Sequence, residues 1–345
     1  MKKNAYFSRA FLLALFISLP LSISSCQKKS FVSKTTSIDI DDGRDGMHLI
    51  LGFSQIGTES SWRTYNSNCI TQAAQDAGIQ IIMEDAQQKQ ANQIKAIRSF
   101  IVYRVDVIAF VPIVEDGWDN VLREAKEAHI PVIVVDRKIR TQDKNLYAGF
   151  IGEDSFSEGE KAAEFLLQKY ADSKSSLNIL EVSGTKKSSV AKERAAGFRR
   201  IISTDKKFSI IKSEDGDFLR SRGKEIIEDI ILSNGSLSIN EKNIDIIFSH
   251  NDGMTLGILE ALEKNSIAPG KDVTIVSIDG EQAAIDALKK GKLSCVVECN
   301  PNTGKDLMHL VKTVANKNTI PRETYVQEGI FTENDNLTQL APRGY

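Results

Sequence analysis

From Met47 onward, short apolar runs rich in β-branched residues alternate with longer segments whose apolar positions recur every three or four residues. The first pattern is typical of buried strands and the second of amphipathic helices. Strands of near-continuous apolar character that alternate with helices predict parallel sheets covered on both faces. We expect strands at 48–53, 79–83, 105–111, 130–135, 146–151, 177–182, 208–211, 244–248, 273–278 and 293–297. We expect helices at 62–77, 92–102, 119–128, 159–170, 190–202, 220–232, 254–264, 283–290 and 304–315.

Two sheets fit this pattern better than one, because open sheets rarely reach ten twisted strands. The segment after Met47 is also long enough for two domains with cores of their own. The predicted fold class is therefore α/β, with two Rossmann-like lobes. The segment from Leu146 to Glu153 lacks a long preceding helix, so we expect the chain to pass there from one sheet into the other.

Several of the predicted strands end abruptly on polar residues. These are Asp136 and Arg137 after one strand, and Asn251, Asp279 and Glu298 at the ends of three later strands. In open α/β sheets, ligands bind beyond the carboxyl ends of the strands. Each residue alone is a weak signal, because an Asp or Asn at such a position often only caps the next helix. Their joint occurrence favours a polar binding cleft.

The loop after the first strand carries a second candidate binding segment, Glu59, Ser60, Ser61, Trp62 and Arg63. Its glycines do not have the dinucleotide-binding spacing and no phosphate-loop lysine follows, which argues against a nucleotide cofactor. An aromatic face flanked by charged groups suits a carbohydrate, since the ring covers C–H groups while the charges bind hydroxyls. The alternative is that Trp62 only packs against a domain edge.

Arg194 lies on the same helical stripe as Val190 and Phe198. A charged residue on an apolar stripe either faces a pocket or pairs with a buried carboxylate, because unpaired burial is too costly. We favour the pocket. Phe218 and Glu298 are candidate wall residues of the same cleft, and a purely structural role is the alternative for both.

The composition argues against several other functions. The net charge of −2 and the absence of a basic block or helix-turn-helix signature argue against nucleic acid as a partner. No nucleophile elbow and no histidine with an identifiable nucleophile partner is present, so we expect no enzyme. No His/Cys cluster has ligand spacing, so we expect no metal and no cofactor. We interpret Cys69, Cys295 and Cys299 as mostly buried small hydrophobic residues.

The first residues predict an exported protein. Residues 1–26 combine a basic start with an apolar run, as in a secretory signal peptide. The sequence Ile23-Ser24-Ser25-Cys26 is similar to a bacterial lipobox, so we expect a lipidated Cys26 that anchors the chain to a membrane. An ordinary signal peptide that happens to contain a cysteine is the alternative. Residues 27–46 are polar and predict a flexible tether.

From Leu49 to about Phe331 the chain resembles the type I periplasmic sugar-binding proteins of ABC importers. Within that family it is similar to the ribose-binding-protein group, and in particular to its galactofuranose-binding members. The matching segments are 52–63, 87–100, 136–137, 216–218, 250–252 and 277–280. The resemblance implies a three-segment hinge between a first lobe of 47–150 plus 299–323 and a second lobe of 151–298 plus 324–345.

The resemblance also implies a function. It implies a periplasmic or cell-surface protein, expected to be a monomer, that encloses a furanose, pentose or galactose-type monosaccharide, with galactofuranose as the expected ligand. The lipid anchor is expected from the sequence before Cys26 and is not general in the family. An ABC permease would receive the sugar; the alternative is a receptor that presents its closed state to a membrane sensor kinase or chemoreceptor. In the family, the positions that match 59–63, Asp136, Arg137, Arg194, Asn251 and Asp279 contact the ligand.

Overall fold

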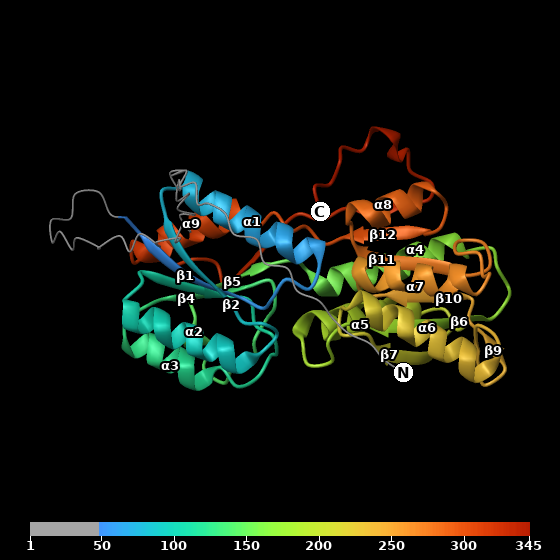
Figure 1. Ribbon diagram of the computed structural model, residues 1–345, viewed down its shortest axis with the longest axis horizontal. Coiled ribbons are helices and arrows are strands. Elements are labelled where there is room, and N and C mark those ends of the chain that lie inside the picture. The colour runs from blue at the N-terminus through green and yellow to red at the C-terminus, as the bar shows by residue number, and fades with distance from the viewer. Residues whose placement is uncertain (1–47) are drawn as a thin grey trace, which may run out of the picture. The chain divides into compact units, whose positions relative to one another are not determined.

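Two six-stranded sheets with helices on both faces make up residues 48–345, the part of the chain that the computed structural model describes (Figure 1). The strands are β1 Ile50–Gln55, β2 Gln80–Asp85, β3 Val107–Phe110, β4 Val132–Val135, β5 Gly149–Gly152, β6 Leu177–Ser183, β7 Phe208–Asp215, β8 Ser238–Ile239, β9 Lys242–Asn243, β10 Ile246–Ser249, β11 Thr274–Asp279, β12 Cys295–Glu298, β13 Glu323–Tyr325 and β14 Ile330–Thr332. The helices are α1 Ser61–Asp76, α2 Gln90–Tyr103, α3 Asp119–Glu127, α4 Ser155–Lys169, α5 Ser189–Ile202, α6 Arg220–Asn234, α7 Asp252–Lys264, α8 Gln282–Lys289 and α9 Gly304–Ala315.

The first sheet has the strand order β13-β5-β4-β3-β1-β2, and all its strands are parallel. One face packs against α2 and α3 through large side chains such as Phe100 and Leu122. The other face packs against α1 and α9 through Ile70 and Val311. The predicted parallel sheet with two covered faces is confirmed for this lobe, because strands buried on both sides must be apolar throughout.

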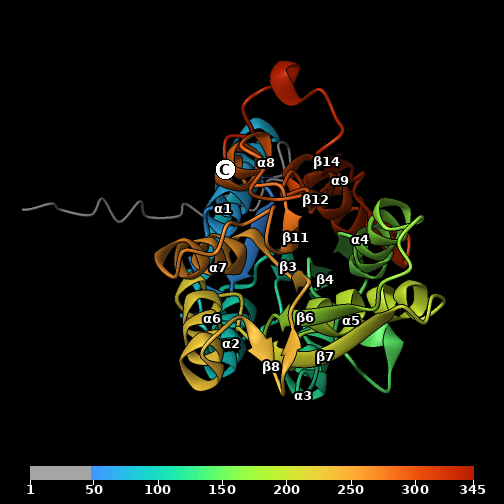
Figure 2. The same cartoon turned by 90° about the vertical axis from the view of Figure 1, so that its right-hand side faces the viewer.

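The second sheet repeats this topology in the order β14-β12-β11-β10-β6-β7. Figure 2 faces this lobe and shows α6 and α7 on one side of the sheet and α4 and α5 on the other. One difference from the expectation is that β14 runs antiparallel to β12. Strands β13 and β14 were not predicted, because three-residue edge strands carry too few apolar positions to show a period.

The chain passes between the two sheets at three places, after β5, after β12 and after β13. The first and third passages differ slightly from the predicted boundaries, which fall inside β5 and inside β13. Both strands pair with the first sheet along their whole length, so the passages begin after Gly152 and after Tyr325. The second predicted boundary follows Glu298, the last residue of β12.

Each of the nine predicted helices overlaps an observed one, and the largest difference is at the start of α4. That helix begins at Ser155, four residues earlier than predicted. Asp154 is its N-cap and accepts a hydrogen bond from the backbone N–H of Ser157 at 3.1 Å. No helix among residues 48–345 is long and apolar enough to cross a membrane. The predicted signal peptide, Cys26 and the tether lie outside the described residues.

Candidate functional site

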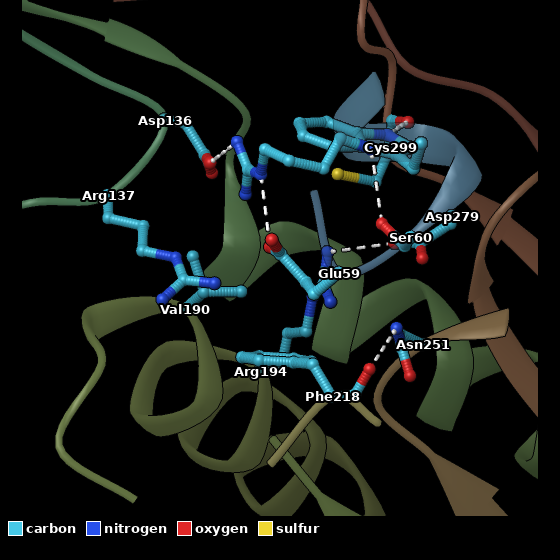
Figure 3. A pocket seen from close by; sticks show the side chains of 12 residues that line it. Glu59, Ser60, Asp136, Arg137, Val190, Arg194, Phe218, Asn251, Asp279 and Cys299 are labelled. Atoms are coloured by element: carbon cyan, nitrogen blue, oxygen red, sulfur yellow. Dashed lines mark hydrogen bonds and ion pairs between the residues drawn. The ribbon is translucent and has the colours of Figure 1, made fainter. Parts of the chain in front are cut away.

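A pocket between the two sheets gathers most of the predicted binding residues (Figure 3). It contains about 370 Å³ of space not filled by protein atoms, part of which is open to solvent. Its walls come from the carboxyl ends of strands in both sheets and from the helix starts that follow them. The lining residues are Glu59, Ser60, Trp62, Arg63, Asp136, Arg137, Val190, Arg194, Phe218, Asn251, Asp279 and Cys299.

The first lobe contributes the start of α1. Ser60 is the N-cap, and its hydroxyl accepts from the backbone N–H of Arg63 at 3.1 Å, which fixes the first helical turn in the pocket wall. The guanidinium group of Arg63 then lies between two carboxylates, at 3.1 Å from Glu59 and 2.5 Å from Asp136. Burial lowers the pKa of Arg63, but Asp136 and Glu59 outweigh it and the net pKa is raised.

Trp62 belongs to the pocket wall and is also fixed by the opposite lobe. Its indole N–H donates to the carbonyl oxygen of Cys299 at 2.7 Å, and its backbone N–H donates to Glu281 Oε1 at 3.1 Å. The ring packs within the apolar cluster of the second lobe, and the guanidinium carbon of Arg63 lies 4.6 Å from its centroid. Trp62 therefore packs at a lobe edge and also lines the pocket, and its contact with a carbohydrate stays a prediction.

Asp136 and Arg137 follow β4 directly. Asp136 has a φ of 61°, in the left-handed region that non-glycine residues rarely adopt. Arg137 is buried, and it forms no ion pair within residues 48–345; its best polar contact is with the carbonyl oxygen of Ile113 at 3.5 Å. Burial lowers the pKa of Arg137, although Asp136 opposes this effect. Arg137 thus has the largest unused hydrogen-bonding capacity among the three arginines of the pocket.

Arg194 on α5 is the main charged residue of the second lobe. Its Nε donates to Glu158 Oε2 at 2.6 Å, and its other nitrogens reach the carbonyl oxygen of His250 and, at 3.6 Å, Asp279 Oδ1. Burial alone would lower the pKa of Arg194. The neighbouring Glu158 and Asp279 raise it by more, so the net pKa lies well above its usual range. The two alternatives from the sequence are both realised, because Arg194 lines the pocket and pairs with a buried carboxylate.

Asn251 and Phe218 form the neighbouring wall. Asn251 caps α7 by accepting from the backbone N–H of Met254 at 2.9 Å, and its Nδ2 contacts the carbonyl oxygen of Phe218 at 3.4 Å. The Phe218 ring fills the space beside Gly184, where a Cβ atom would collide with it. Phe218 has a φ of 60°. The glycine therefore allows the aromatic ring to reach the pocket.

Asp279 is the last residue of β11 and has a φ of 135°. Asp136, Phe218 and Asp279 are thus three pocket residues with a positive φ. Unfavourable backbone conformations concentrate at functional sites, where the surrounding structure holds them. Here Asp252 holds the turn, since its Oδ2 accepts from the backbone N–H groups of Gly280 and Glu281, both at 2.7 Å. Burial raises the pKa of Asp279 well above its usual range, and Arg194 only partly opposes this.

Two predicted residues do not line the pocket. Ser61 is exposed on the outer side of α1. Glu298 points to the C-terminal segment, where it pairs with Arg343 and accepts from the backbone N–H of Gly329 at 2.7 Å. Cys299, the residue that follows β12, lines the pocket in place of Glu298.

Val190 and Cys299 line the pocket but were not predicted to do so. Val190 lies one helical turn before Arg194, so its position on the same stripe was an available signal. Cys299 gave no such signal, because buried cysteines usually serve as small core residues. Within the described chain all three cysteines are free thiols; Cys295 and Cys299 are buried, and Cys69 is half-buried.

The two lobes also touch at the rim of the pocket. The backbone N–H of Lys138 in the first lobe donates to the hydroxyl of Ser189 at 2.7 Å, and its ammonium group contacts Glu193 at 3.1 Å. A second ion pair joins Glu115 of the first lobe to Lys192 of α5. These contacts, with those of Trp62, define a closed arrangement of the lobes.

The charges of the pocket are balanced. Three carboxylates, of Glu59, Asp136 and Asp279, accompany the guanidinium groups of Arg63, Arg137 and Arg194. Such a set offers many hydrogen-bond donors and acceptors without a net charge, which suits a neutral polyhydroxylated molecule. The pocket lining contains no histidine or lysine.

Comparison with known proteins decides the family. Residues 51–319 match the family model of the periplasmic binding protein domain. The chain belongs to the periplasmic binding protein family. This periplasmic binding protein is 38% identical over 301 residues to the galactofuranose-binding protein YtfQ of Escherichia coli (strain K12), covering 86% of this chain and 93% of the relative. The resemblance seen in the sequence is confirmed, and the chain is a solute-binding protein rather than an enzyme.

Solved structures of relatives share this fold. A Mycobacterium smegmatis protein in complex with β-D-fucofuranose is 42% identical, with a TM-score of 0.78, covering 83% of this chain and 91% of its own. The binding protein of the arabinose ABC transporter from Shewanella sp. ANA-3, bound to α- and β-L-arabinofuranose, is 37% identical with a TM-score of 0.77, covering 82% and 92%. The predicted fold of two Rossmann-like lobes is confirmed.

Proposed function

We propose that this periplasmic binding protein encloses a neutral monosaccharide in its furanose form, of the galactofuranose, fucofuranose or arabinofuranose type. The observation that carries the proposal is the charge-balanced pocket with polar groups from both lobes. The carboxylates would accept hydrogen bonds from hydroxyls, and the Asn251 amide would donate to hydroxyls or accept from them. The guanidinium groups of Arg137 and Arg194 would donate to ring and hydroxyl oxygens. Trp62 and Phe218 would cover the C–H faces of the sugar.

Closure is part of the proposed function. A ligand that contacts groups on both lobes favours the closed arrangement by its differential affinity for that state. The rim contacts of Lys138 and Glu193 would form at the same time. The closed form would deliver the sugar to an ABC permease, a role supported by the relatives that are named as import binding proteins.

Isothermal titration calorimetry tests the ligand class. The panel contains L-arabinose, D-fucose, D-galactose, D-fructose and D-ribose, with D-galacturonic acid as a charged control that matches D-galactose except for its carboxylate. We expect tight binding of at least one sugar that forms a furanose ring, and a crystal structure of that complex should show the furanose. The uronate should bind more weakly than D-galactose, because the formal charges of the pocket lining already balance without it. No binding across the panel, or preference for the uronate, would contradict the proposal.

We also propose that Cys26 carries the lipid anchor, a role supported by the lipobox-like sequence before it. In a bacterial host, the full chain should fractionate with membranes and incorporate labelled palmitate, whereas Cys26→Ala should do neither. Cys69→Ala is the matched control and should behave like the parent chain. Equal membrane fractions of the parent and Cys26→Ala would show that the segment is not an anchor.

A further inference from the structure

The three passages between the lobes bring titratable side chains to one buried cluster. Glu153 lies in the first passage, Cys299 in the second and Glu328 in the third. Glu158 of α4 completes the cluster, and ligand-type atoms of Glu158, Cys299 and Glu328 all lie within 4.8 Å of one another. The hinge of this protein is therefore built around carboxyl groups rather than apolar side chains.

These carboxyl groups have too few donors for all to be ionised. One oxygen of Glu158 accepts from Arg194 at 2.6 Å, while the other is buried without a donor. One oxygen of Glu328 accepts from the backbone N–H of Asp154 at 3.3 Å, and the other is likewise buried without a donor. Both oxygens of Glu153, which is 2% exposed, have no donor at all. An ionised carboxylate in such a place is costly, so at least one of the three must be neutralised.

The surrounding charges do not supply this neutralisation. Lys161 reaches only the backbone carbonyl oxygen of Glu328, at 3.3 Å. Arg194 is already shared between Glu158 and Asp279. Two nearby arginines already have carboxylate partners: Arg63 pairs with Asp136 near Glu153, and Arg343 pairs with Glu298 beside Gly329. Asp279, near Cys299, adds negative charge.

We propose that the hinge is a proton-binding site in which Glu328 is protonated in the closed protein and donates a hydrogen bond to Glu158. Glu158 then stays ionised and pairs with Arg194, which lines the pocket. The proton on Glu328 in the hinge thereby supports an ion pair of the pocket wall. In agreement with this geometry, burial raises the pKa of Glu328 to about 11, with the nearby Glu158 carboxyl group adding to the increase. Burial also raises the pKa of Glu153, and Asp136 and Glu158 raise it further.

A divalent cation is the competing means of neutralisation, because a thiol and two carboxyl groups form a metal-donor set. A cation would have to share Glu158 with the guanidinium group of Arg194. The cluster therefore favours a proton, and a metal becomes an outcome of the test.

The proton gives a pH dependence with a defined sign. A carboxyl group whose pKa is raised by folding stabilises the protein fully below its unfolded pKa of about 4.3, and that contribution is lost as the pH rises towards the folded value. Chemical unfolding should therefore be compared at several pH values between 5 and 9 for the parent chain and Glu328→Gln. Glutamine keeps the shape and donates as the protonated acid does. We expect the parent to lose up to about tenfold in its folding equilibrium per pH unit relative to Glu328→Gln.

Glu323→Gln is the matched control, because it makes the same change five residues earlier at an exposed position and should follow the parent. Infrared spectra in heavy water at neutral pH give a second readout, since the parent should show the C=O band of a protonated carboxyl group that Glu328→Gln lacks. Identical pH profiles of parent and Glu328→Gln would overturn the proposal. Stabilisation of the parent by Zn²⁺ or Mn²⁺, absent in Glu328→Gln, would also overturn it in favour of a metal. Neither measurement requires a sugar, so the result is independent of the proposed ligand.

Discussion

The two lobes share one strand order but hold their pocket arginines in different ways. In the first lobe, Arg63 lies between Glu59 and Asp136, and all three line the pocket. In the second lobe, Arg194 is held mainly by Glu158, which lies behind the pocket wall, and by a backbone carbonyl group, while Asp279 of the pocket lining lies farther away, at 3.6 Å. In the first lobe, a sugar would therefore meet an arginine and carboxylates that already pair with one another. In the second lobe, it would meet an arginine whose main carboxylate partner, Glu158, does not line the pocket.

In the first lobe, a change to one pocket carboxylate should therefore alter sugar affinity with little effect on the free energy of unfolding. In the second lobe, a change to Arg194 should alter both quantities. A sugar can compete for the carboxylates beside Arg63, because each of them is itself part of the pocket surface. Removing one still leaves Arg63 with the other. Removing Arg194 leaves Glu158 buried without its partner, which destabilises the folded protein as well as the site.

The largest effect is expected for Arg194→Ala. The free energy of unfolding should fall by about 3–5 kcal/mol, because a buried carboxylate loses its cation. Sugar binding should disappear from calorimetry at the same time. Arg200→Ala is the control on the same helix: its side chain is 62% exposed and pairs with Glu160, so we expect less than about 1 kcal/mol. A parent-like unfolding free energy for Arg194→Ala would remove the distinction between the lobes.

A smaller and more selective effect is expected for Asp136→Asn. The amide keeps the shape but removes the charge, so sugar affinity should fall by about 2 kcal/mol. The unfolding free energy should change by less than about 1 kcal/mol, since Arg63 keeps Glu59. Titration calorimetry and denaturant unfolding measure the two quantities. Asp116→Asn, which breaks an ion pair on the surface, should change neither. If Asp136→Asn were destabilised as much as Arg194→Ala, sugar affinity and folding stability would depend on the same residues in the first lobe too.

The smallest effect is expected at the rim, where Lys138 and Glu193 join the lobes. Both side chains are 27% exposed, so a double-mutant cycle with Lys138→Met and Glu193→Gln should give a coupling below about 1 kcal/mol in sugar affinity. The coupling should shrink further at high salt. The same cycle on Arg98 and Glu124, which pair within the first lobe, should give no coupling to affinity. A coupling of several kcal/mol at the rim would mean that closure depends on this pair rather than on the pocket.

The local features of the site follow from the sequence. Asp136, Asn251 and Asp279 could be placed at the strand ends because an apolar run that stops on a polar residue reports a change from buried strand to loop. Which of two adjacent residues at a strand end faces the pocket was harder to predict. Glu298 was expected to line the pocket, but Cys299, the first residue after β12, does so, because the apolar run alone does not show which side chain at a strand end faces the pocket.

Partners distant in sequence could not be predicted. Ser155 and Glu158 have the spacing of a capping box, yet Asp154 caps α4, and Glu158 is buried as the partner of Arg194, 36 residues away. The edge strands β13 and β14 were missed for a related reason, since their pairing with β5 and β12 is decided by the sheets they join.

The sequence by itself determined the alternation of strands and helices, the two-lobe fold and the strand ends that carry polar groups. These depend on periodicity, which each segment of the chain carries on its own. Only the tertiary structure decided which carboxylate neutralises which arginine, which side of a strand end faces the pocket, and that Glu153, Glu158 and Glu328 meet at the hinge. The physical reason is that pairing and burial of charge depend on distances between segments far apart in the chain, and these are fixed only when the lobes pack.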